Sequence, residues 1–256
     1  MKFNVDSKEM QNALDKVQVK GKHLTANGFS SSNIGTLFWA ELEGNSLSIW
    51  NGDATIICSI KLEVEGEQNG NFIGDAKEIA PFLKSFSDTV QFVIDDSSIH
   101  MNVEGKNASV PKIAIHSGFD AINRMRTMIQ HIRYEVVPNT LFAFNSIPLE
   151  GAFTLSQELF SDTIKSCELA KTGLYKLDYK EDNSVHFTSG SNTASKFSIE
   201  LTPSFHLGEA ATLQFSSPLY SFFDKGQLLN FYVKDEFPVI IVAEDRILLK
   251  APAVDN

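Results

Sequence analysis

The chain has 256 residues, of which 43% are hydrophobic and 21% charged, a composition typical of one large or two medium globular domains and not of a disordered protein. Twenty phenylalanines and stretches rich in Ile, Val and Thr favour β-structure. The net charge of −10 argues against a domain that grips nucleic acid tightly, because such domains are usually basic. No apolar run is long enough for a secretory signal or a membrane span, so we expect a soluble protein with buried, reduced thiols at Cys58 and Cys167 rather than a disulfide.

The first half of the chain begins with an amphipathic helix, for which Asp6 or Ser7 is the predicted N-cap. A second short helix contains Pro81 and starts at Asp75 or Ala80, because proline fits best in a first turn. In chain order the predicted elements are a helix over 7–17, a three-stranded meander over 35–64, the proline-bearing helix over 81–86, and strands over 90–94 and 99–103.

The second half repeats this order. Each meander turns first on an Asn-Ser step, at Asn45-Ser46 and at Asn183-Ser184, and then on a glycine. The matching elements are a helix over 156–170, a meander over 172–203, a proline-bearing segment over 218–223, and strands over 229–233, 239–242 and 247–249. Because chance rarely produces helix, meander, proline segment and closing strands twice in one order, the pattern predicts a tandem repeat.

Each half therefore reads β-α-βββ-β-α-βββ, and we expect an α+β fold with two tandem similar domains, each with antiparallel sheets covered by two helices. Solvated helices are ordinarily lysine-rich. The same enrichment on or beside four helices nevertheless favours helices that line a hole and meet DNA phosphates without reading bases. The lysines that this hypothesis turns toward DNA are Lys8, Lys16, Lys20, Lys22, Lys77, Lys84, Lys165, Lys171 and Lys225.

The order of these elements resembles a known family across nearly the whole chain. The resemblance to bacterial DNA polymerase beta clamps lies in Met1–Val5, Leu47–Ile60 and Asp75–Ile79. The C-terminal tail resembles the proliferating-cell nuclear antigen family more than the beta clamps, in Phe237–Val242 and Leu248–Pro252. The resemblance implies a sliding clamp with clamp domain 1 over 1–115, an interdomain connector over 116–150 and clamp domain 2 over 151–256.

The resemblance also implies a function and partners. It implies a non-enzymatic processivity factor that encircles double-stranded DNA as a homotrimeric ring, tethers a replicative DNA polymerase and is loaded by a clamp loader ATPase. The protein would act in the cytoplasm of a prokaryotic or phage-infected cell. A phage is favoured because the start of the chain resembles bacterial clamps and its end resembles the nuclear antigen family. The joint between chains would pair a strand near 99–110 of one chain with a strand near 184–198 of the next.

A partner-peptide pocket is the remaining implication of the resemblance. Its tail side would be formed by Pro238, Leu249, Ala251 and Pro252, and its other wall by Trp50 and Ile56. Ordinary strand packing is the alternative for Pro238 and Leu249. A basic helix predicted over 119–133 departs from the extended connectors of the family, and three roles stay open: packing beside the pocket, docking a loader or polymerase, or touching DNA.

Nothing in the sequence predicts catalysis, a metal or a cofactor. Asp95 and Asp96 fall at a hairpin turn, where aspartate is expected. Gly66, Gly70 and Gly74 fall in a polar turn with no phosphate-binding motif after them. The six histidines have no metal-ligand spacing: His23, His100, His116, His131, His186 and His206.

Two other functions stay open at this level. One is a clamp-like accessory factor that remains monomeric or dimeric and holds DNA by direct charge. The other is a duplicated β-rich structural or protein-binding module, such as a virion component, without a DNA role.

Overall fold

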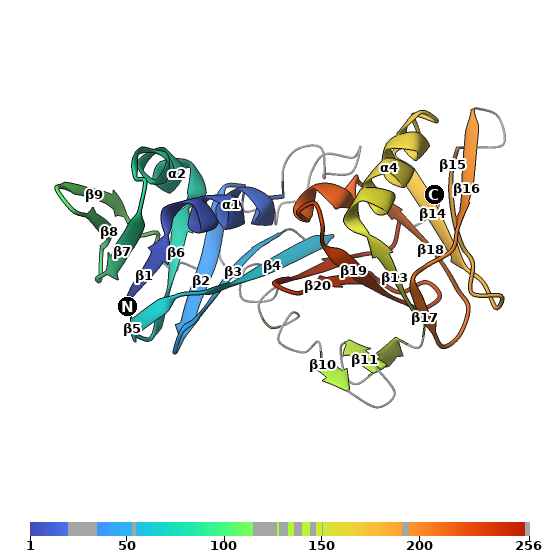
Figure 1. The fold of residues 1–256 in the computed structure, drawn as a ribbon, viewed down its shortest axis with the longest axis horizontal. Helices are drawn as coiled ribbons and strands as arrows, with labels where there is room; N and C mark the ends of the chain where they lie inside the picture. The colour runs from blue at the N-terminus through green and yellow to red at the C-terminus, as the bar shows by residue number, and fades with distance from the viewer. Residues whose placement is uncertain are drawn as a thin grey trace. The chain divides into compact units, whose positions relative to one another are not determined.

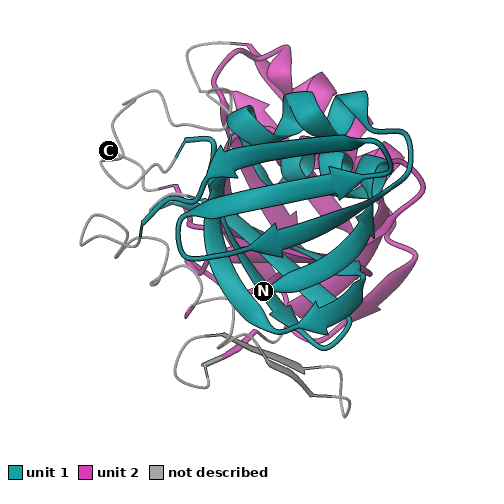
Figure 2. Cartoon of the chain, turned by 90° about the vertical axis from the view of Figure 1, so that its left-hand side faces the viewer, with its two compact units in different colours: residues 1–19, 31–126 teal, residues 20–30, 127–256 magenta. Residues whose placement is uncertain are grey.

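The computed structural model describes most of the chain, and its contacts divide it into two compact units. Unit 1 comprises residues 1–19 and 31–126, and unit 2 comprises 20–30 and 127–256 (Figure 2). The predicted division into 1–115, 116–150 and 151–256 stays a prediction. The described residues are 1–19, 35–52, 55–114, 127, 133–135, 140–143, 147–149, 151–190 and 195–253.

Unit 1 begins with a strand that runs directly into a helix, and it contains a second helix between two groups of strands (Figure 1). Its elements are β1 (Lys2–Asp6), α1 (Ser7–Val17), β2 (Leu37–Glu43), β3 (Ser46–Gly52), β4 (Ile56–Glu63), β5 (Glu65–Gln68), β6 (Gly70–Asp75), α2 (Ala76–Ser85), β7 (Thr89–Ile94), β8 (Ser98–Val103) and β9 (Lys106–Pro111).

Unit 2 follows the same plan after a three-stranded sheet of its own. That sheet consists of β10 (Arg133–Glu135), β11 (Thr140–Ala143) and β12 (Ile147–Leu149). The other elements are β13 (Gly151–Ser156), α4 (Gln157–Glu168), β14 (Leu174–Tyr179), β15 (Val185–Gly190), β16 (Lys196–Leu201), β17 (Phe205–Leu207), β18 (Ala211–Ser216), η3 (Leu219–Phe222), β19 (Leu228–Val233), β20 (Val239–Ala243) and β21 (Arg246–Lys250).

Strand pairing confirms the tandem repeat. In unit 1 the antiparallel pairs give the orders β5-β1-β7-β8-β9 and β4-β3-β2-β6. In unit 2 the corresponding orders are β17-β13-β19-β20-β21 and β16-β15-β14-β18. The two units therefore pair their strands in corresponding orders, and they share one topology.

The cores repeat as well. Phe3 on β1 stacks on its cross-strand partner Phe92, with ring centroids 5.0 Å apart. Phe153 on β13 stacks in the same way on Phe231, at 4.8 Å, and Phe160 of α4 meets Phe231 edge to face at 5.0 Å. All five rings are buried, and each stacked pair joins the strand before the first helix of its unit to the strand after the second helical segment.

The helices begin where the sequence predicts. Asp6 caps α1, Asp75 caps α2 and Ser156 caps α4, each accepting hydrogen bonds from backbone N–H groups of the first turn. Gly173, shortly past α4, has a φ of +67°. In unit 1, α1 and α2 pack against each other on one side of the strands (Figure 1).

Three sequence expectations are wrong in detail. The glycines assigned to a polar turn lie in β5 and β6; a Cβ on Gly66 would stand 1.8 Å from the Gly44 carbonyl oxygen, so the close approach of β5 requires glycine. Pro81 lies inside α2 rather than in its first turn, and the helix continues to Ser85. The second helix of unit 2 is only the four-residue 3₁₀ turn η3 after Pro218, held by the buried side chains of Leu219 and Phe222.

Of the predicted connector helix over 119–133, the structure describes only Thr127 and Arg133. Thr127 has helical backbone geometry, whereas Arg133 is the first residue of β10 and not helical as predicted. The proposed roles of this segment are therefore untested.

Removal of the N-cap of α1 should destabilise this fold moderately. Asp6 Oδ1 accepts hydrogen bonds from the N–H groups of Lys8 and Glu9, at 2.8 and 3.0 Å. We expect Asp6→Ala to lower the free energy of unfolding by about 1 kcal/mol, because two donors lose their acceptor. Urea unfolding should show this loss, whereas Asp6→Asn should keep most of the stability; equal stability of all three proteins would contradict the cap.

Candidate DNA-facing and partner-binding surfaces

The lysines predicted to face DNA are largely accessible where they are described. Lys8, Lys77, Lys84 and Lys165 are exposed on the outer faces of α1, α2 and α4, and Lys16 is half-buried. Lys165 stands 5.3 Å from the centre of the Tyr220 ring and 3.9 Å from Asp162 Oδ1. Lys20 and Lys22 lie outside the described residues.

Two of the predicted lysines are not on helices. Lys171 follows the end of α4 with a φ of +58°, and Lys225 lies in the turn between η3 and β19. Both are exposed. They flank the helical segments of unit 2 rather than forming part of them.

The helices also carry acid on their exposed faces. α1 has two lysines against Glu9 and Asp15, and α2 has two lysines against Glu78, a net charge of +1. α4 has one lysine against three acids, a net charge of −2: Glu158, Asp162 and Glu168. Lysines therefore outnumber acids on α2 but not on α4, so a positive surface is not common to all the helices.

The residues predicted for the partner pocket differ in accessibility. Pro238, Ala251 and Pro252 are partly exposed. Leu249 is 4% exposed and lies in β21, opposite Ile240. Trp50 and Ile56 are buried, at 6% and 0%, in β3 and β4. The tail residues thus offer some side-chain surface, whereas the two residues assigned to the other wall are packed as core.

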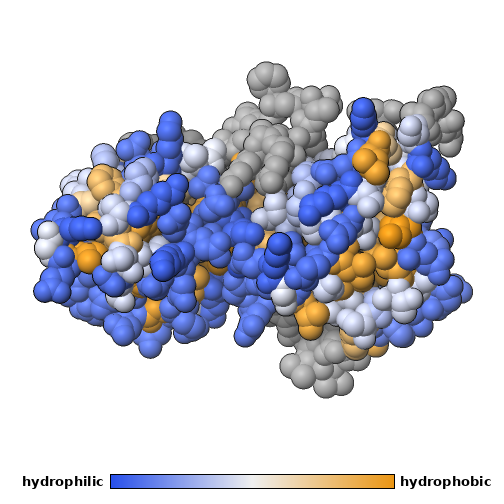
Figure 3. Space-filling model, turned by 45° about the horizontal axis from the view of Figure 1, so that its top comes forward, coloured by the Kyte–Doolittle hydropathy of each residue, from blue (hydrophilic) through white to orange (hydrophobic). Residues whose placement is uncertain are grey.

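The surface between these features is mostly polar. In the space-filling view, hydrophilic residues dominate the visible face and separate apolar patches lie among them (Figure 3). Among the residues that the structure describes, the exposed large hydrophobic side chains are Phe82, Leu159, Leu169, Leu174, Phe205 and Leu228. No described helix is long and apolar enough to cross a membrane.

Two polar clusters look like sites but are turns. Asp95 Oδ1 accepts from the N–H groups of Ser97 and Ser98, each at 2.8 Å, and its Oδ2 lies 2.9 Å from His100 Nε2. The hydrogen bond with His100, followed by those from the two N–H groups, holds the pKa of Asp95 well below its usual range. This geometry confirms the interpretation of Asp95 as a hairpin-turn residue.

The second cluster contains serine, histidine and aspartate but is not a nucleophilic triad. Ser184 Oγ lies 3.0 Å from His186 Nε2 and donates to Asp182 Oδ1 at 2.7 Å. A triad needs the carboxylate on the imidazole nitrogen opposite the serine. Here the carboxylate takes the serine hydroxyl and the Ser184 N–H instead, which closes a turn. Within the described residues no group of three His, Cys, Asp or Glu side chains could hold a metal.

Among the edge strands of the two units, β9 and β16 lie nearest the predicted joint. β9 ends the series β5-β1-β7-β8-β9, and β16 ends the series β16-β15-β14-β18. On β16, Phe197 and Ile199 are half-buried on the side that faces α4, whereas Lys196, Ser198 and Glu200 are exposed. Such edges present unpaired backbone groups that can pair with another chain.

Comparison with known proteins gives no match by sequence but a clear match by structure. No protein-family model and no curated protein matches the chain. The beta subunit of DNA polymerase III from Thermotoga maritima matches with a TM-score of 0.74 at 14% identity, over 100% of this chain and 66% of that one. A. fulgidus PCNA, solved with the C-terminal region of FEN-1 bound, matches with a TM-score of 0.71 at 12% identity, over 100% of this chain and 99% of that one.

The chain has the fold of a DNA polymerase sliding clamp. The Helicobacter pylori beta clamp bound to a DNA ligase peptide also matches, with a TM-score of 0.66 at 13% identity, over 100% of this chain and 67% of that one. The chain spans about two thirds of the T. maritima beta subunit and nearly all of A. fulgidus PCNA. The α+β fold expected from the sequence is confirmed.

Proposed function

We propose that this chain is a sliding-clamp subunit, which encircles duplex DNA and tethers a replicative DNA polymerase. The observation that supports this function most is the repeated topology of the two units together with the match of the whole chain to a two-domain clamp. A ring holds DNA by topology, so a net charge of −10 does not oppose the function. The protein would act without catalysis, in the cytoplasm of a prokaryotic or phage-infected cell.

Contact with DNA would rest on a few exposed lysines rather than on a continuous basic wall. Lys77 and Lys84 of α2 and Lys8 of α1 are the exposed helical lysines of unit 1, and Lys165 is the helical lysine of unit 2. Such contacts to phosphates are weak, diffuse and salt-sensitive, which permits sliding. The acidic face of α4 would make fewer contacts with DNA phosphates than α1 and α2. Lys171 and Lys225 flank this face.

Ring closure would use the two sheet edges. α2 packs beside β9, where Lys106 Nζ donates to the Ser85 carbonyl at 2.9 Å, and α4 packs beside β16. The net charges of α2 and α4 are opposite, +1 against −2. A head-to-tail contact between the β9 edge of one chain and the β16 edge of the next therefore joins complementary charges, and three two-unit chains would close a ring of six units.

The mass in solution tests this assembly. We expect a trimer of three times 28.4 kDa by light scattering after size exclusion. Opposite edge charges predict that the trimer weakens as salt rises, because exposed charges are screened. A monomer or dimer at micromolar concentration and moderate salt would instead favour an accessory factor that holds DNA by charge.

Partner proteins would dock on the tail residues. The structures of A. fulgidus PCNA and of the H. pylori beta clamp hold peptides from FEN-1 and DNA ligase, respectively. By analogy the partly exposed Pro238, Ala251 and Pro252 would receive peptides from the polymerase and the clamp loader ATPase.

The acidic face of α4 favours one alternative, a duplicated β-rich structural or protein-binding module without a DNA role. The two functions differ in DNA binding. A clamp should be retained on circular DNA and released when the circle is cut, whereas such a module should show no difference between circle and linear DNA.

A further inference from the structure

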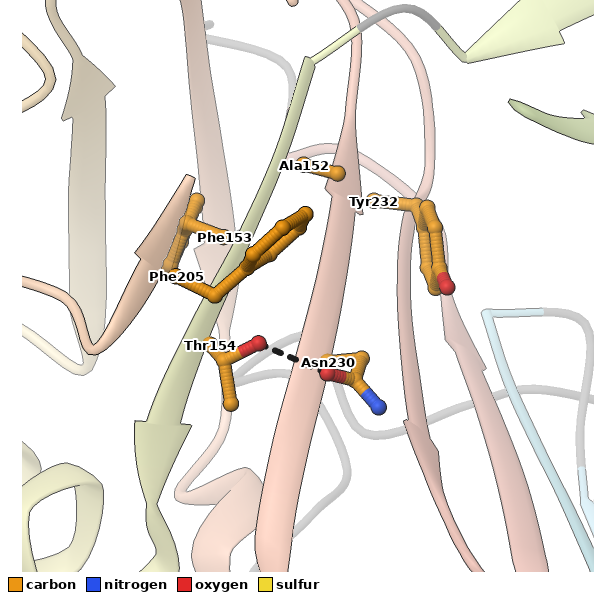
Figure 4. Close-up of a pocket in the computed structure, with 6 residues that line it drawn as sticks. All are labelled: Ala152, Phe153, Thr154, Phe205, Asn230 and Tyr232. Atoms are coloured by element: carbon orange, nitrogen blue, oxygen red, sulfur yellow. Dashed lines mark hydrogen bonds between the residues drawn. The ribbon is translucent and has the colours of Figure 1, made fainter. Parts of the chain in front are cut away.

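A small hollow lies in the outer face of the unit 2 sheet, on the side away from α4 (Figure 4). Phe153 and Phe231 pack on the side of Phe160 of α4, so the alternate residues of β13 and β19 point away from that helix. The volume of about 290 Å³ is at the lower limit of small-molecule sites, which favours a single side chain as the occupant. The lining residues are Ala152, Phe153, Thr154, Phe205, Asn230 and Tyr232.

Two aromatic rings stand on opposite sides of this hollow. Phe205, on β17, is 43% exposed, and Tyr232, on β19, is partly exposed. Ala152 is the cross-strand partner of Tyr232, and its small side chain leaves the space between the two rings open (Figure 4). Because the faces of aromatic rings are electron-rich, a space between two rings attracts a cation more than a neutral group of the same shape.

The polar groups of the lining are acceptors. Thr154 Oγ1 donates its proton to Asn230 Oδ1 at 2.7 Å, so both oxygens keep lone pairs that can accept from a ligand. The amide nitrogen of Asn230 is directed away from the space between the rings (Figure 4). None of the described residues that line the hollow is Lys, Arg or His. A ligand that brings positive charge and N–H donors therefore meets no opposing group there.

Acids outnumber bases at the end of the hollow where Tyr232 lies. Glu209 is exposed and lies beside the first residue of β13, since a Cβ on Gly151 would stand 2.6 Å from the Glu209 carbonyl oxygen. After β19 the chain enters a turn that contains one lysine and two exposed acids: Lys234, Asp235 and Glu236. With the net charge of −10 of the whole chain, this surrounding attracts a cationic segment.

The repeat shows that the fold does not require aromatic residues at these positions. The stacked phenylalanine pairs of the two units set the correspondence between their strands. By this register, Glu65 stands in unit 1 where Phe205 stands in unit 2, and Val93 stands where Tyr232 stands. In unit 1, Asn4 Nδ2 donates to Glu65 at 3.2 Å. The aromatic pair is therefore a property of unit 2 and not of the clamp topology.

We propose that the hollow between Phe205 and Tyr232 binds one arginine side chain of a partner protein, with the guanidinium between the two rings and its N–H groups directed at the oxygens of Thr154 and Asn230. Arginine suits the site better than lysine, because a guanidinium is planar, stacks on aromatic rings and is more weakly hydrated than an ammonium. All of these residues belong to unit 2 and none to the predicted partner pocket, so the site does not depend on ring closure or on docking at the tail.

Three peptides test the charge requirement on the native protein. Each is a pentapeptide with glycine and serine flanks, and its central residue is arginine, citrulline or leucine. In a ¹H–¹⁵N titration we expect the arginine peptide to shift backbone amides of β13, β17 and β19 and to bind at least tenfold more tightly than the other two. Citrulline keeps the shape of arginine without its charge, and leucine is an apolar anchor alone. The proposal is overturned if no peptide shifts these strands, or if the citrulline or leucine peptide binds equally well.

Matched variants decide whether the two rings are responsible. Phe205→Leu and Tyr232→Leu should each weaken binding of the arginine peptide about fivefold, because each removes a ring but keeps an apolar wall and the net charge. Phe82→Leu, which changes an exposed phenylalanine of unit 1, should leave the affinity unchanged. If neither ring variant weakens binding, or if Phe82→Leu weakens it as much, the peptide is held by diffuse charge and the proposal fails. Thermal melts establish that each variant is folded.

Discussion

Placing a lysine at Ile199 should convert the proposed trimeric ring into monomers. Ile199 is half-buried on the edge strand β16, beside the acidic helix α4, and the opposite edge carries Lys84 and Lys106. In Ile199→Lys the new ammonium replaces apolar contact and faces like charge across the joint. We expect a loss of about 2–4 kcal/mol per contact, which is about 30- to 1,000-fold in each association constant.

Light scattering should then report a mass near 28.4 kDa at micromolar concentration. Thr188→Lys is the matched control, because Thr188 lies in the same sheet on β15 but not at its edge. The control should remain trimeric. Because Ile199 also packs within unit 2, melting curves must show that both variants are folded. A folded trimer of Ile199→Lys would exclude β16 as the joint.

Replacing Arg246 should cause a large loss of stability in unit 2. Arg246 is 4% exposed, and its Nη1 donates to the Phe222 carbonyl at 2.6 Å. Its Nη2 donates to Asp224 Oδ2 at 2.7 Å and to Asp245, and its Nε donates to Asp245 Oδ1 at 2.8 Å. One guanidinium therefore ties the end of η3 to the start of β21, and both carboxylates depend on it.

In Arg246→Met the chain keeps a side chain of similar length but leaves the two carboxylates without their cation. We expect a decrease of about 2–3 kcal/mol in the free energy of unfolding, because the buried Phe222 carbonyl loses its donor and two carboxylates that are about a third exposed lose their cation. Arg246→Lys should lose less but not recover fully, since an ammonium cannot serve both acids and the carbonyl in the geometry of the fork. Urea unfolding measures both variants, and a Met variant within 1 kcal/mol of the native protein would contradict the account.

Local signals in the sequence were sufficient for the helices and for the repeat. Asp6 and Ser156 are capping residues followed by apolar residues at helical spacing, and both helices begin there. The paired turns at Asn45 and Asn183 placed the two meanders correctly. The stacked pairs Phe3–Phe92 and Phe153–Phe231 were not predicted, because a cross-strand contact joins positions that periodicity along one strand does not relate.

The surfaces were less predictable, for two different reasons. The acids Glu158 and Asp162 share the exposed face of α4 with Lys165, at spacings of four and three residues that the sequence already contains. Counting lysines without these acids overestimated the positive charge of that helix. By contrast, the burial of Ile56 and the link from Arg246 to Asp224 depend on tertiary packing, which no pattern within either segment reveals.

Topological retention on DNA is the most direct test of the clamp function. The protein is mixed with linear DNA, the ends are ligated into a circle, and the mixture is washed at the highest salt at which light scattering still shows the trimer, to remove charge-held protein. A closed ring threaded on the DNA should stay with the circle through the wash and leave when a restriction enzyme opens it. Protein that washes off the circle, or that remains bound after cutting, would contradict encirclement of DNA.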